Sequence, residues 1–161
     1  MAAMQQSSCM NNGRNKMKQY VNKIILKEYK EQIGLTGVYF DLEFKSGLTL
    51  VYGDSGVGKT LFVEKLRNLA AIREDICIMD YSTSKKMLDM VFINKGLKDT
   101  LIVIDNGDVL LSKKHREVIK HDFDNQYIIF TRDCTGMFRG PSSVANMVRK
   151  GNIITLEYIQ L

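Results

Sequence analysis

One segment of the 161-residue sequence has residue types and a spacing that could bind phosphate groups. Its pattern is a glycine, four residues, a second glycine, a lysine and a hydroxyl residue. Glycines let successive backbone amides turn toward one anion, in conformations that side chains disfavour. The segment consists of Gly53, Asp54, Ser55, Gly56, Val57, Gly58, Lys59 and Thr60.

Each position in this segment has an expected task. Lys59 supplies a mobile positive charge for the β- and γ-phosphates of a nucleotide, and the Thr60 hydroxyl can ligate Mg²⁺. Asp54, Ser55 and Val57 are expected to contribute backbone amides only. A helix that begins at the end of the segment would also direct its positive dipole end at the phosphates.

The flanking residues predict the strand and the helix that such a loop needs. Residues 48–52 form a β-branched apolar run, which is typical of a buried strand. Residues 61–72 have apolar side chains at helical spacing. The sequence therefore predicts that the loop connects a buried strand to a helix.

The remaining chain alternates between strand and helix patterns, which indicates a mostly parallel sheet covered on both faces. We expect a disordered polar and basic leader over residues 1–16 and a single domain over residues 17–161. Strands are predicted at 38–44, 76–79, 101–104, 127–130 and 153–159, and helices at 84–95, 109–121 and 142–149. Residues 21–29 fit either a strand or a helical stripe.

Several polar side chains follow the predicted strands and could join the site. Asp105 ends the apolar run of residues 101–104, and its carboxylate is a suitable ligand for Mg²⁺ together with Thr60 and water. Asp108 lies just past the turn signal Asn106-Gly107, where it could act in chemistry or cap the following helix.

On these residues the sequence resembles the P-loop NTPases, with GDSGVGKT as the Walker A element and LIVID as the Walker B element. The resemblance implies a three-layer α/β core with a mostly parallel sheet, and ATP and Mg²⁺ as ligands. The strand and helix between the two elements are similar to those of additional-strand ATPases. Residues 34–52 look like the N-terminal β-hairpin of ABC-type or AAA-like cores, which favours a strand at 24–29.

The same resemblance supplies candidates for catalysis and one departure from the family pattern. Thr131 follows the strand at 127–130, where many such ATPases carry a residue that senses the γ-phosphate. Asp80 ends the strand at 76–79, where RecA-like ATPases can place a catalytic carboxylate. A glutamate usually follows the Walker B aspartate, but here that place holds Asn106, which cannot accept a proton as a carboxylate does. Asp80 or Asp108 would then have to substitute.

We therefore expect an ATP-binding protein whose Mg-dependent hydrolysis is slow or is completed by a protein partner or a second copy. The alternatives are a non-hydrolysing nucleotide-binding module, a small kinase and a nucleic-acid-associated ATPase. Arginines that could complete the site are Arg132, Arg139 and Arg149, by position only.

Charge and hydropathy limit the location and the partners. The net charge is +5, and residues 1–30 carry six basic and one acidic side chain. The basic segment 14–30 could contact nucleic acid, an acidic partner or anionic lipid, or serve as a solvated leader. The sequence has neither an apolar run of about 18 residues nor a secretory signal, so we expect a cytoplasmic protein without a membrane segment. His115 and His121 are expected on the surface.

Overall fold

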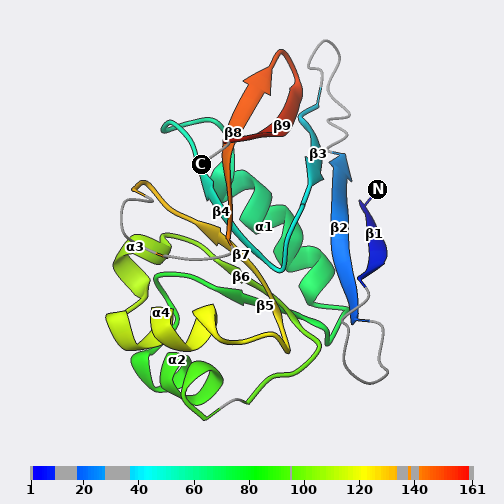
Figure 1. Ribbon diagram of the computed structural model, residues 1–161. Helices are drawn as coiled ribbons and strands as arrows, with labels where there is room; N and C mark the ends of the chain where they lie inside the picture. The colour runs from blue at the N-terminus through cyan, green and yellow to red at the C-terminus, as the bar shows by residue number, and fades with distance from the viewer. Residues whose placement is uncertain are drawn as a thin grey trace.

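The computed structural model describes residues 2–9, 18–27, 37–94, 96–133, 138 and 142–159. In these residues nine strands form one sheet, in the order β1-β2-β3-β9-β8-β4-β7-β6-β5 (Figure 1). The strands are β1 (Ala2–Cys9), β2 (Lys18–Lys27), β3 (Tyr39–Glu43), β4 (Leu48–Tyr52), β5 (Ile76–Met79), β6 (Leu101–Ile104), β7 (Gln126–Phe130), β8 (Ser143–Lys150) and β9 (Ile153–Tyr158).

The strands β8, β4, β7, β6 and β5 run parallel to one another. The three in the middle of this region have mostly apolar sequences (LTLVY, QYIIF and LIVI) because both of their faces are covered. The chain leaves β4 for β5, β6 and β7 on one side, and returns to β8 on the other. The carboxyl end of β4 therefore lies at a point where strand connections diverge, which is where ligands bind in open parallel sheets.

The rest of the sheet contradicts the predicted three-layer core with a mostly parallel sheet and an N-terminal hairpin. The sheet is mixed and curled, because β1, β2 and β3 pair antiparallel and β8 and β9 form an antiparallel hairpin. The two strands expected to form the N-terminal hairpin, β3 and β4, pair with other strands. β3 lies between β2 and β9, whereas β4 lies between β7 and β8. The arrangement depends on pairing between strands that are far apart in the sequence, such as β3 and β9. Turn signals within a few residues cannot predict pairing of this kind.

Four short helices accompany the sheet in the described part of the chain. They are α1 (Lys59–Ala70), α2 (Lys85–Phe92), α3 (Gly107–Leu110) and α4 (Lys113–Lys120). Helix α1 lies inside the curl of the sheet, and the other three gather on the opposite side (Figure 1). Few and short helices of this kind do not form the two full helical layers that were predicted.

Two helix predictions are wrong in detail. The helix predicted at 142–149 is wrong, because this segment belongs to strand β8 and pairs with β4 and β9. Val144 and Met147 have a spacing that also fits a helical stripe. The helix predicted at 109–121 is divided into α3 and α4. Ser112 divides it, since its side chain accepts a hydrogen bond from the amide of His115 and so begins a new helix.

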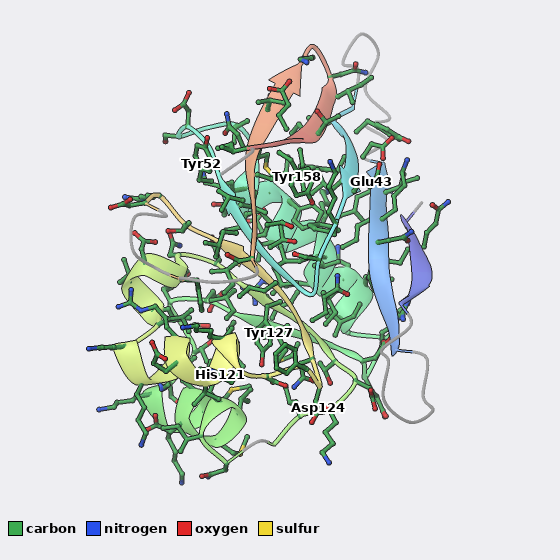
Figure 2. All side chains as sticks on the ribbon, viewed as in Figure 1. Glu43, Tyr52, His121, Asp124, Tyr127 and Tyr158 are labelled. Atoms are coloured by element: carbon green, nitrogen blue, oxygen red, sulfur yellow. The ribbon has the colours of Figure 1, made fainter. Side chains whose placement is uncertain are left out.

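The core has two parts, one on each face of the parallel strands. Alternate residues of a strand point to opposite faces, so Leu101 and Val103 pack with α1 while Ile102 and Ile104 pack with α2 and α4. Tyr127, labelled in Figure 2, lies on the second face and its ring centroid is 6.3 Å from that of Phe92. The sheet therefore has α1 packed on one face and α2 and α4 packed on the other.

A buried glutamine closes the curl of the sheet around α1. Gln126, at the start of β7, accepts a hydrogen bond from the Val21 amide (2.8 Å) and donates one to the Val21 carbonyl (2.7 Å). Both residues are about 5% exposed. This pair of bonds joins β2 to β7, although four other strands separate them in the sheet order.

Other expectations have mixed outcomes. The strand expected at 24–29 is confirmed over residues 24–27 as part of β2, while residues 28 and 29 lie outside the described residues. The leader expected to be disordered includes strand β1. His115 is buried, contrary to the expected surface position, while His121 is exposed. Among the described residues, no helix has the length and apolar character required to cross a membrane.

Candidate functional site

The predicted phosphate-binding segment borders a cavity of about 640 Å³ at the carboxyl end of β4. Of the eight predicted residues of this segment, seven line the cavity and Val57 does not. Val57 instead packs against the core on the α1 side of the sheet. The cavity therefore lies where strand divergence predicts a ligand site.

The glycines of the segment occupy positions that larger residues would disturb. Gly56 and Gly58 have φ angles of +85° and +119°, which side chains disfavour. A Cβ atom on Gly58 would lie 2.7 Å from Ile154 Cδ1, and one on Gly53 would lie 2.9 Å from the Met147 carbonyl oxygen on β8. The loop thus turns tightly against β8 and β9, and α1 begins directly after Gly58.

The ammonium group of Lys59 lies across the loop. Its Nζ donates hydrogen bonds to the Gly53 carbonyl and, at 3.0 Å, to the Asp54 carbonyl. Partial burial lowers the pKa of Lys59, although the charge of Asp105 acts in the opposite direction. The lysine is therefore held beside the cavity by neutral carbonyl groups and not by a tight ion pair.

Asp105 faces the loop from the end of β6. Its side chain is 8% exposed, and Oδ1 accepts a hydrogen bond from the Asn106 amide at 3.0 Å. Burial raises the pKa of Asp105, and the nearby Asp80 carboxylate raises it further. Asn106 also lines the cavity, and its φ of +53° is a left-handed conformation that asparagine tolerates.

Asp80 lies at the end of the adjacent strand β5 but outside the cavity lining. It is 6% exposed, forms an ion pair with Arg67 of α1, and accepts hydrogen bonds from the amide (2.8 Å) and hydroxyl (2.6 Å) of Ser82. Burial alone would raise the pKa of Asp80, but these hydrogen bonds outweigh it and lower the pKa. The Asp80 carboxylate is consequently ionised, and its oxygens already have partners in Arg67 and Ser82.

Asp108 and Thr131 also lie outside the cavity lining. Asp108 is in the short helix α3, is not a helix N-cap, and has a buried Oδ1 without a hydrogen-bond partner. Thr131 is 2% exposed, and its hydroxyl donates to the Asp133 carbonyl at 2.6 Å. Lys59, Thr60 and Asp105 thus line one cavity. The other three candidates, Asp80, Asp108 and Thr131, do not line it.

The cavity also contains two arginines and an apolar wall. Arg132 follows β7 and Arg149 lies near the end of β8, while Arg139 falls outside the described residues. Val38, just before β3, and Ile154 of β9 contribute apolar surface. No local sequence signal could have identified these two residues, because the pairing of β3 with β9 brings them to the site.

The donor set of the cavity fits a hard divalent cation. Thr60 and Asp105 offer a hydroxyl and a carboxylate oxygen, and Mg²⁺ commonly takes one or two protein oxygens and completes its shell with water and phosphate. No group of three or more metal-ligating side chains occurs among the described residues.

Comparison with known proteins does not assign the chain to a family. No protein-family model matches the sequence, and no curated protein matches it. The functional assignment therefore depends on the residues and their arrangement.

Proposed function

We propose that this protein binds a nucleoside triphosphate, expected to be ATP, with Mg²⁺ at the cavity beside residues 53–60. The observation that carries the proposal is the arrangement at one cavity of the glycine loop, Lys59 and Asp105. The loop connects a buried strand to a helix, as phosphate binding through backbone amides requires. The proposal concerns the site and does not depend on a particular fold family.

Charge and size support a phosphate ligand. Lys59, Arg132 and Arg149 line the cavity with positive charge, against the carboxylates of Asp54 and Asp105. The volume of about 640 Å³ lies within the range of roughly 300–1,000 Å³ that is usual for small-molecule and cofactor sites. The apolar wall could accept the less polar part of the nucleotide.

Thr60 and Asp105 would hold the magnesium ion. The raised pKa of Asp105 reflects burial and the neighbouring Asp80 carboxylate, and a divalent cation would favour the ionised form of both. When bound, Mg²⁺ neutralises charge on the β- and γ-phosphate oxygens. The protein's own part is to position the phosphates on the loop amides and to bring Lys59 to them.

We infer that hydrolysis is slow or needs a protein partner. Asn106 follows Asp105 and lacks a carboxylate, and Asp80 is held by Arg67 and by Ser82. A general base must reach the water that it activates, and neither Asp80 nor Asp108 lines the cavity. The same observation favours a second candidate function, a nucleotide-dependent switch without turnover.

The first experiment compares ATP affinity of the wild type and Lys59→Ala by isothermal titration calorimetry. Hydrogen bonds to charged groups contribute about 1.5–3 kcal/mol, so the affinity should fall about tenfold or more. Lys98→Ala, an exposed lysine outside this cavity, is the matched control and should bind normally. Equal ATP affinity in Lys59→Ala and the wild type would contradict the proposal.

Two further experiments test magnesium binding and ATP hydrolysis separately. Asp105→Asn should weaken ATP binding more in the presence of Mg²⁺ than in excess chelator, and an equal loss in both conditions would make Asp105 structural. Phosphate release from saturating Mg-ATP, absent in Lys59→Ala, would establish a nucleotide hydrolase. Bound ATP without release would favour the switch.

A further inference from the structure

Two helices of the protein begin with the same three residues, Ser-Lys-Lys. Ser84 precedes α2 and Ser112 precedes α4, and each serine accepts a hydrogen bond from the amide three residues later (both 3.2 Å). The lysines that follow are all exposed and occupy the first turns of the helices. They are Lys85, Lys86, Lys113 and Lys114, which we call the lysine patch.

The topology brings the two halves of the lysine patch to one side of the molecule. Helix α2 follows β5, and α4 follows β6 through α3, and these strands are parallel. Both helices therefore start at the carboxyl edge of the sheet, and they pack against each other. The positive charges of Lys85 and Lys114 both act on Asp89, which shows that the two halves share one neighbourhood.

The charge of the lysine patch is only partly compensated, because Asp89 and Glu117, one turn further along α2 and α4, are two carboxylates for four lysines. The first turn of a helix is the positive end of its dipole, so lysines there are unfavourable by a few tenths to about 1 kcal/mol each. Neither helix has an acidic residue in its first turn. In the described part of the chain no salt bridge joins these lysines to a carboxylate, and Asp89 is hydrogen-bonded to His115 at 2.9 Å.

A tyrosine extends into solvent beside the lysine patch. Tyr81 is 87% exposed and lies three residues before Ser84. Its Cα atom is therefore within about 11 Å of the start of α2. An exposed aromatic ring next to several lysines is the combination on which single-stranded nucleic acids bind, with phosphates on the lysines and a base stacked on the ring.

We propose that the lysine patch and Tyr81 form a binding surface for single-stranded nucleic acid. The lysines would neutralise successive phosphates, and Tyr81 would stack on a base without selecting its identity. An acidic protein would also be attracted by the lysines, but it would gain less from an isolated ring that stands in solvent. This surface is separate from the nucleotide cavity and from the basic segment 14–30, of which Lys23 pairs with Asp41 at 2.9 Å.

The experiment measures binding of a fluorescent oligothymidylate of about 20 nucleotides by anisotropy, at several salt concentrations and without ATP. The test variant changes all four patch lysines to glutamine. The control changes an equal number of lysines elsewhere, so that both proteins have the same net charge. The control combines Lys45→Gln, Lys98→Gln, Lys120→Gln and Lys150→Gln.

Binding by the test variant should be at least about tenfold weaker than binding by the control at low salt. The slope of log affinity against log salt should fall by about 3, because four single-strand phosphate contacts each contribute about 0.7. Tyr81→Ala should weaken binding about fivefold or more, and Tyr81→Phe should retain it, since stacking needs the ring alone.

Circular dichroism and thermal melting would show that the variants fold, and loss of the patch lysines should not lower the melting temperature. Equal binding by the test variant and the control would overturn the proposal. So would competition by polyglutamate as strong as that by unlabelled oligonucleotide, because that result would identify an acidic protein as the preferred class of partner. Unchanged binding by Tyr81→Ala would remove the single-strand assignment.

Discussion

The phosphate-binding loop offers a matched pair of glycine substitutions that separates backbone strain from steric conflict. Gly56 and Gly58 both have positive φ angles, +85° and +119°. A Cβ atom on Gly56 would have no neighbour within 4 Å, whereas one on Gly58 would lie 2.7 Å from Ile154 Cδ1. Alanine at Gly56 therefore tests strain alone, and alanine at Gly58 tests strain together with a clash.

The expected losses differ in size. Gly56→Ala should reduce the free energy of unfolding by about 1–2 kcal/mol, the cost of a left-handed residue. Gly58→Ala carries about 1–3 kcal/mol of strain and about 1–3 kcal/mol of overpacking against buried Ile154, or about 2–6 kcal/mol together. The lower unfolded-state entropy of alanine offsets about 0.4–1 kcal/mol in each variant.

Urea denaturation of the two variants and the wild type measures these losses directly. The loss in Gly58→Ala should exceed that in Gly56→Ala by at least about 1 kcal/mol. The reasoning is refuted if the two variants are equally stable, because the contact with Ile154 would then have no energetic effect. Greater stability of either variant than the wild type would refute the strain argument itself.

Two more predictions concern polar groups away from the cavity, the buried Gln126 and the half-buried Asp122. Gln126→Leu should lower the free energy of unfolding by about 2–4 kcal/mol, measured in urea, because it leaves the amide and carbonyl of Val21 without partners; a loss below about 0.5 kcal/mol would contradict this role. Burial would raise the pKa of Asp122, but hydrogen bonds from Tyr127 and Asn125 outweigh it and lower the pKa. The contribution of ionised Asp122 to the free energy of unfolding is therefore complete above the unfolded-state pKa of about 3.9. This contribution is lost as the pH falls through the lower folded-state pKa. Asp122→Asn should be less stable than the wild type at pH about 7, with a gap that narrows toward pH about 3, and a gap independent of pH would contradict the assignment.

The sequence alone predicted the parts of the structure that depend on local patterns. The strand before the glycine loop, the helix after it and the position of Asp105 at the end of β6 are confirmed. These features follow from apolar runs, helical spacing and turn chemistry over a few residues. The gathering of the loop and Asp105 at one cavity then follows from the parallel pairing of β4, β7 and β6.

The features that sequence reasoning missed depend on partners far away in the chain. The predicted hairpin of β3 and β4 is wrong because each strand pairs with other strands of the sheet. The predicted helix at 142–149 is wrong because the spacing of Val144 and Met147 suits a helix as well as the strand β8. His115 was expected on the surface, but it is buried between α2 and α4 with its ring 5.5 Å from Phe92. Its hydrogen bond to Asp89 satisfies the buried ring nitrogen, and that partner lies 26 residues earlier.

The hydrogen bonds between Gln126 and Val21 also constrain how the protein folds as it is synthesised. The two residues are 105 positions apart, so β2 leaves the ribosome long before β7 exists. Contacts of such sequence separation form late and slow folding, because a large loop must close before they contribute. During that interval β2 and its neighbours expose apolar side chains that later cover α1, including Ile24 and Leu42. We therefore expect the early strands to be the part of the chain most prone to aggregation until the second half of the chain arrives.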